Sequence, residues 1–127
     1  MSAFAAIDLV RERGIVPTRP VAVTAFSDEE GARFGVACVG SQLSTGAVTP
    51  ARALALRDND GISLGEALIS AGRDPHQLGE DPDLVDRVGV YVELHVEQGR
   101  ALDLIDSPIA VASSIWPHGR WQFVFSG

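Results

Sequence analysis

The most constraining feature of this sequence is a nearly continuous apolar run at residues 21–26, which leads into Asp28-Glu29-Glu30 and then Gly31. Because apolar and polar residues do not alternate in it, the run predicts a strand buried on both faces, as in a parallel sheet covered by helices. Ligands of such sheets bind beyond the carboxyl ends of the strands. The acidic run is therefore either a solvated turn or a candidate site at the rim of a sheet.

Residues 2–13 are predicted to form a helix before this strand. Ala3, Ile7 and Val10 recur at helical spacing, and Gly14 marks a C-terminal end. A helix that leads through a short loop into a buried strand is the second half of a βαβ unit. We therefore expect an α/β fold with a mostly parallel sheet.

The middle of the chain predicts short helices and turns. In order, these are a helical turn at 32–37, a helix at 51–56 after Thr49-Pro50, a turn at 59–61, a helix at 63–69 that starts in a Ser63–Glu66 capping box, and a polar loop at 73–86 with one helical turn.

The last third contains three runs of β character. Residues 89–96 alternate, so that His95 lies on the polar face of the predicted strand, near its end. A short helix is expected at 100–104. Residues 109–115 and 121–125 are two further predicted strands.

Charge and composition narrow the class of protein. The 127 residues suit one domain or part of one, and 46% of them are hydrophobic, which is enough for a core. A net charge of -7 argues against a surface for nucleic acid or anionic lipid. We expect no signal peptide and no membrane span, and hence a cytoplasmic protein. The single cysteine, Cys38, is expected to be a small buried apolar residue.

Two acids and one imidazole carry the chemical hypothesis. Glu29 and Glu30 repel each other, and a divalent cation is a common relief for that repulsion. One of the two carboxylates and His95 would form zinc- or manganese-type ligation, and the other carboxylate could act as a general base. The alternative, a solvated acidic turn and a structural histidine, stays open on these residues alone.

Three segments resemble a known family: FSDEEGARF at 26–34, VGS at 39–41 and YVELHVEQG at 91–99. They are similar to the zinc-dependent amidohydrolases that cleave N-carbamoyl amino acids, allantoate and ureidopropionate, within the aminoacylase and carboxypeptidase-like metallopeptidase superfamily. The resemblance implies a hydrolase of linear amide or ureido C–N bonds. It also implies part of a three-layer α/β/α catalytic domain at 1–112, and the first strands of a lid and dimerisation domain at 113–127.

The resemblance also assigns roles to residues. It implies that Glu29 is the general base, that Glu30 and His95 are metal ligands, and that Gln98 contacts the substrate. Arg33, Phe34, Glu93 and Glu97 match positions expected to be supporting. Zinc is the expected metal, with manganese, nickel or cobalt as alternatives, and the complete family site holds two ions. A homodimer is expected of a full-length member.

The sequence also departs from the family pattern. The first histidine ligand, the bridging aspartate and the last histidine ligand have no counterpart in these residues. We therefore expect the 127-residue chain to be inactive on its own, because catalytic zinc sites typically use three protein ligands. An aminoacylase or dipeptidase of the same superfamily, and a non-catalytic remnant or interaction module, remain alternatives.

Overall fold

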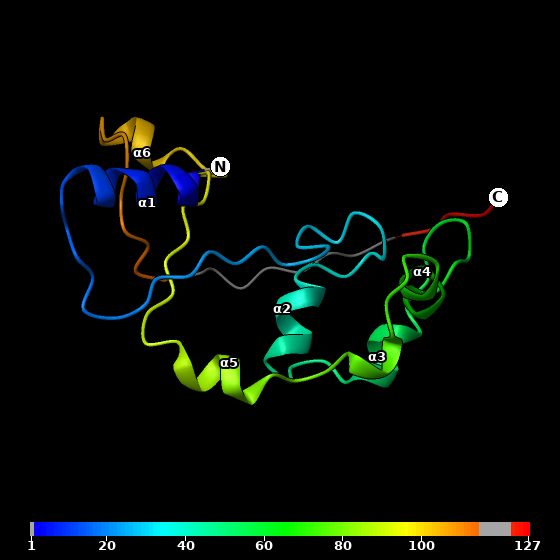
Figure 1. Ribbon diagram of the computed structural model, residues 1–127. Helices are drawn as coiled ribbons and strands as arrows, with labels where there is room; N and C mark the ends of the chain where they lie inside the picture. Colours follow the sequence, from blue (N-terminus) through cyan, green and yellow to red (C-terminus); the bar gives the residue numbers. More distant parts are fainter. Residues whose placement is uncertain (1, 115–122) are drawn as a thin grey trace. The chain divides into compact units, whose positions relative to one another are not determined.

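The computed structural model describes residues 2–114 and 123–127. The contacts divide the chain into two compact units, Met1–Glu93 and Leu94–Gly127. The elements, labelled in Figure 1, are α1 (Ser2–Glu12), α2 (Val39–Ser44), α3 (Pro50–Leu54), α4 (Leu64–Ser70), the 3₁₀ turn η1 (Pro75–Gln77), α5 (Pro82–Arg87) and α6 (Ala101–Leu104). The domain boundary expected at 112–113 stays a prediction, and residues 115–122 of that region lie outside the described residues.

Helix α1 confirms the predicted first helix. It ends where Gly14 takes a left-handed backbone with φ of 64°. The N–H of Gly14 donates to the carbonyl of Arg11, and the N–H of Ile15 donates to that of Val10, which together form a Schellman motif. No residue of α1 is fully buried, although Ile7 and Val10 of its apolar stripe are half-buried.

The packed core lies in the first unit, where α2 contacts α3 and α5, and α4 contacts α3 and η1. Its buried side chains are Val39, Leu43, Val48 and Ala53, and Leu56, Leu64 and Leu78 pack against them. Val39 and Leu43 are four residues apart, so they share one face of α2. This small core positions the loop before α2, which carries the acidic run.

The helical turn predicted at 32–37 forms only in part, because the N–H of Gly35 donates to the carbonyl of Gly31 across residues 32–34 but residues 35–37 are not helical. Residues 32–34 form a turn, and the helix begins only at Val39, after Cys38. Two glycines explain the difference, because Gly31 and Gly35 have φ of 68° and 72°, outside the helical region.

Most other local predictions of the middle region are confirmed. The Thr49 hydroxyl accepts the N–H of Arg52 at the start of α3, with proline in the first turn. Ser63 and Glu66 form both halves of a capping box at the start of α4. Gly61 closes the turn at 59–61 with φ of 79°. The polar loop at 73–86 differs in part, because it contains both η1 and α5 where one helical turn was predicted.

The strands predicted at 21–26 and 89–96, which lie within the described residues, are not paired. Residues 21–26 and 89–96 run without regular secondary structure, and the one β-bridge in the described part of the chain joins Arg57 to Ser63. Their side chains are largely exposed, with Val21 at 61% and Val92 at 85%. A strand buried on both faces needs to lie in a sheet whose two faces are both covered, usually by helices. The parallel sheet and the lid strands therefore stay predictions, and the runs at 109–115 and 121–125 lie partly outside the described residues.

No described helix combines the length and the hydropathy required to cross a lipid bilayer.

Candidate functional site

Asp28, the first acid of the run, stabilises the turn in which it lies through hydrogen bonds to its side chain. Asp28 has a positive φ of 50°, which aspartate tolerates better than most residues. Its Oδ1 accepts the N–H of Arg33 at 3.2 Å, and its Oδ2 accepts the N–H of Phe34 at 3.2 Å. Its carbonyl accepts the N–H of Gly31. The Asp28 carboxylate is therefore engaged by the loop, whereas Glu29 and Glu30 are exposed.

Close backbone approaches hold the turn in place. A Cβ built on Gly31 would lie 2.6 Å from the amide nitrogen of Ala37, so only glycine fits there. The N–H of Cys38 donates to the Glu29 carbonyl at 2.6 Å, and the N–H of Gly40 donates to the Ser27 carbonyl at 3.2 Å. The acidic turn is thus tied to the start of α2 by main-chain hydrogen bonds.

Cys38 was missed as part of this site. It is half-buried rather than buried, with a positive φ of 59°, and its thiol lies 3.8 Å from Oε1 of Glu29. Partial burial, followed by the charge and the hydrogen bond of Glu29, raises the pKa of the thiol above its ordinary value. No spacing rule could have found this contact, because it depends on how the loop closes.

Tyr91 and Glu93 form a second polar pair in the same unit. The Tyr91 hydroxyl donates to Oε2 of Glu93 at 3.0 Å. This hydrogen bond, together with burial and the charges of Glu93 and Glu29, raises the pKa of Tyr91. The charge of Glu93 also acts on Cys38. The supporting role expected of Glu93 stays a prediction, and its contact with Tyr91 was not predicted.

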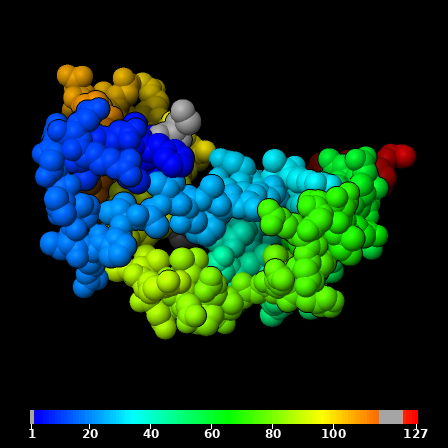
Figure 2. Space-filling view, in the orientation of Figure 1, coloured from blue at the N-terminus to red at the C-terminus, as the bar shows by residue number. Residues whose placement is uncertain are grey.

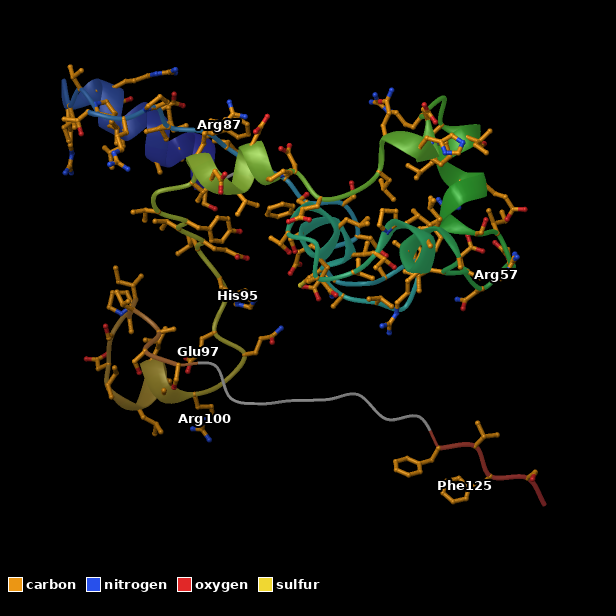
Figure 3. All side chains as sticks on the ribbon, turned by 90° about the horizontal axis from the view of Figure 1, so that it is seen from below. Arg57, Arg87, His95, Glu97, Arg100 and Phe125 are labelled. Atoms are coloured by element: carbon orange, nitrogen blue, oxygen red, sulfur yellow. The ribbon has the colours of Figure 1, made fainter. Side chains whose placement is uncertain are left out.

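Figure 3 labels His95 and Glu97 on the segment that leads into α6. The carbonyl of Val96 can only accept, so Nδ1 of His95 donates to it, at 2.5 Å. The lone pair of the neutral ring then lies on Nε2, which suits a metal ligand. Glu97 is structural, since its carboxylate accepts the N–H groups of Ala101 at 2.6 Å and Leu102 at 3.1 Å.

Glu30 and His95 each offer a donor atom of a type that suits a divalent metal ion. Glu30 presents an exposed carboxylate, and His95 presents Nε2, which are ligand types that zinc and manganese accept. His95 and Gln98 belong to the second unit, so their approach to Glu29 and Glu30 stays a prediction. Within the described residues no group of three or more His, Cys, Asp or Glu could hold a metal ion.

Comparison with known proteins identifies relatives. No family model matches the chain. The chain is 42% identical to an N-carbamoyl-L-amino acid amidohydrolase of Geobacillus stearothermophilus, over 86% of the chain and 26% of that protein. It is 35% identical to an allantoate deiminase of Arabidopsis thaliana, over 100% of the chain and 25% of that protein. It is 36% identical to a ureidoglycolate hydrolase of Oryza sativa subsp. japonica, over 100% of the chain and 27% of that protein.

These similarities confirm the resemblance carried by the acidic turn and the His95 segment. The chain spans about a quarter of the length of these relatives. It therefore belongs, as a segment of that length, to the amidohydrolase family that includes N-carbamoyl-L-amino acid amidohydrolases and allantoate deiminases.

Proposed function

We propose that this chain is part of a metal-dependent hydrolase of linear ureido or amide C–N bonds. The observation that carries the proposal is the Glu29–Glu30 pair on a turn fixed by main-chain hydrogen bonds, in a chain similar to amidohydrolases. The substrate class is a small N-carbamoyl or ureido compound, as the names of the relatives suggest.

Glu29 is the proposed general base. Its exposed carboxylate can take a proton from the attacking water and deliver it to the leaving amine. The thiol of Cys38 hydrogen-bonds the same carboxylate and limits its rotation. Gln98 is the proposed substrate contact, where its amide can pair with a carbamoyl group.

Glu30 and His95 are the proposed metal ligands. The hydrogen bond from Nδ1 of His95 to the Val96 carbonyl fixes the tautomer that leaves Nε2 available. A bound divalent ion would polarise the scissile carbonyl and make water easier to deprotonate. Zinc is the first candidate, and manganese, nickel and cobalt suit the same donors.

The test is a chimera in which residues 1–127 replace the matching segment of the Arabidopsis relative, which matches the chain over its whole length. Ammonia release from N-carbamoyl amino acids, allantoate and ureidoglycolate would be measured with each metal in turn. We expect turnover by the chimera and none by the 127-residue chain alone. An N-acyl amino acid or dipeptide as the only substrate would favour the aminoacylase alternative. A folded, metal-loaded chimera without turnover would favour the non-catalytic alternative.

Three variants of the chimera separate the proposed roles. Glu29→Gln should lower kcat about 10²–10⁴-fold at unchanged metal content, because it removes only the base. Glu30→Gln and His95→Gln should lower metal affinity about 10-fold or more, measured by titration with a chelating dye. Glu12→Gln, at the exposed end of α1, is the matched control and should match the parent.

A further inference from the structure

The two carboxylate oxygens of Asp58 serve two different segments. Oδ1 accepts the N–H groups of Asp60 at 3.1 Å and Ile62 at 2.9 Å, which closes the 58–62 turn. Oδ2 accepts Nε of Arg33 at 3.1 Å, 25 residues earlier in the chain. The Asp58 side chain is only 9% exposed. It is thus a fixed acceptor, held by its own turn and aimed at Arg33.

Arg33 closes the far end of the acidic turn. Its backbone N–H and that of Phe34 donate to the two oxygens of Asp28. Its guanidinium lies 5.1 Å from the centre of the Phe34 ring, which is 8% exposed. In Figure 2 the cyan atoms of this loop lie beside green atoms of the segment that follows α3, in agreement with the Arg33–Asp58 hydrogen bond.

We propose that Asp58 is a positioning residue for Glu29 and Glu30, and that it acts through Arg33. The proposal rests on the proposed function of the two glutamates. The turn at 27–31 is neither helix nor paired strand, so its shape depends on the contacts at its ends. The tether through Arg33 joins that turn to the loop between α3 and α4. Loss of the tether would let the carboxylates move by the small distances to which catalysis is sensitive.

Asp58→Asn is the variant that separates tethering from folding. Its side-chain oxygen can replace Oδ1 and keep both N–H bonds of the 58–62 turn, while its amide nitrogen replaces Oδ2 and cannot accept from Arg33. Arg33→Leu removes the tether from the other side. Asp60→Asn is the matched control, because Asp60 offers Asp58 only its backbone N–H.

The first readout is backbone amide exchange in the 127-residue chain, followed by NMR. In Asp58→Asn and Arg33→Leu we expect about tenfold faster exchange at the amides of Phe34 and Cys38, which donate to Asp28 and Glu29. Amides of the 58–62 turn and of α2 should keep their rates. The double variant should equal either single variant, because both remove one interaction. Uniform acceleration at every amide, or none at Phe34 and Cys38, would overturn the proposal.

The second readout is kinetic, in the chimera. Asp58→Asn should lower kcat about tenfold with KM unchanged, because the base is displaced while substrate contacts remain. A chimera that depends on Glu29 but keeps full kcat in Asp58→Asn would overturn the positioning role and leave the proposed function standing. If the parent chimera has no turnover, the proposed function fails, while amide exchange still decides whether Asp58 fixes the turn.

Discussion

Cys38 and Glu29 are joined twice, by the Cys38 N–H donating to the Glu29 carbonyl at 2.6 Å and by the Cys38 thiol 3.8 Å from the Glu29 carboxylate. The contact requires Cys38 to adopt a left-handed backbone with φ of 59° at the N-cap of α2. A side chain in that conformation costs about 1–2 kcal/mol relative to glycine. The proposed base is thus held by a residue in an unfavourable conformation.

Replacing Cys38 by glycine should therefore raise the free energy of unfolding by about 1 kcal/mol, since glycine adopts positive φ freely. The lost thiol contact offsets little of this gain, because a thiol is a weak donor. Urea unfolding of the 127-residue chain measures the change. Ala37→Gly, at a residue without positive φ, is the control and should lose about 0.4–1 kcal/mol. Equal losses in both variants would contradict the prediction.

The reactivity of Cys38 should report on Glu29. Partial burial and then the negative charge of Glu29 raise the pKa of the thiol, so less thiolate is present at a given pH. Glu29→Gln removes that charge, and alkylation by iodoacetamide at pH 8 should become severalfold faster by mass spectrometry. Glu12→Gln, on exposed α1, should leave the rate unchanged. An unchanged rate in Glu29→Gln would show that the two side chains are not in contact.

Local structure could be predicted from the sequence where the interacting residues are close together in the chain. The Schellman motif at Gly14 and the capping box of Ser63 and Glu66 involve residues no more than five apart, so a local pattern predicts them. The helical turn predicted at 32–37 forms only over residues 32–34, because the pattern did not show that Gly35 adopts a positive φ.

Longer-range features could not be predicted. Strand pairing of residues 21–26 depends on neighbours that a single run does not specify, and its sheet stays a prediction. The proposed acids of the site, Glu29 and Glu30, were named from the sequence, and their roles stay predictions. The contacts that fix them, through Cys38 and Asp58, span 9 and 25 residues and follow no periodicity.

The capping box of α4 should be worth a measurable part of the stability. The Ser63 hydroxyl accepts the N–H of Glu66 at 3.1 Å, and Ser63→Ala removes that acceptor. We expect the free energy of unfolding to fall by about 1 kcal/mol. Ser70→Ala, at the last residue of the same helix, is the control and should change it little. Equal effects at both positions would contradict a capping role.

The capping box of Ser63 and Glu66 should also make the free energy of unfolding depend on pH. Hydrogen bonds from the Ser63 hydroxyl and N–H lower the pKa of Glu66 below its ordinary value of 4.5. A lowered pKa in the folded state means that Glu66 stabilises the fold above pH 4.5, and that this contribution is lost as pH falls through the folded value. Glu66→Gln keeps the box but cannot titrate. Unfolding measured from pH 7 to pH 3 should therefore show a smaller loss of stability in Glu66→Gln than in the parent chain.

A comparison of Gly31 with Gly35 separates the effect of packing around the acidic turn from the effect of backbone conformation. Gly31 and Gly35 have nearly equal φ, 68° and 72°, so a Cβ costs each a similar backbone penalty. Their surroundings differ, since a Cβ on Gly31 would meet the main chain of Val36 and Ala37 at 2.6 Å, while one on Gly35 would meet nothing within 4 Å.

Gly35→Ala should therefore lose about 1–2 kcal/mol of unfolding free energy, from the backbone alone. Gly31→Ala should lose about 2–5 kcal/mol, because it must also push apart two main-chain segments. In the chimera, Gly31→Ala should lower kcat more than Gly35→Ala does, since the displaced segment carries the Glu29 carbonyl contact with Cys38. Urea unfolding and kcat measure the two effects. Equal losses in the two variants would show that Gly31 is not packed against residues 36–37 in solution.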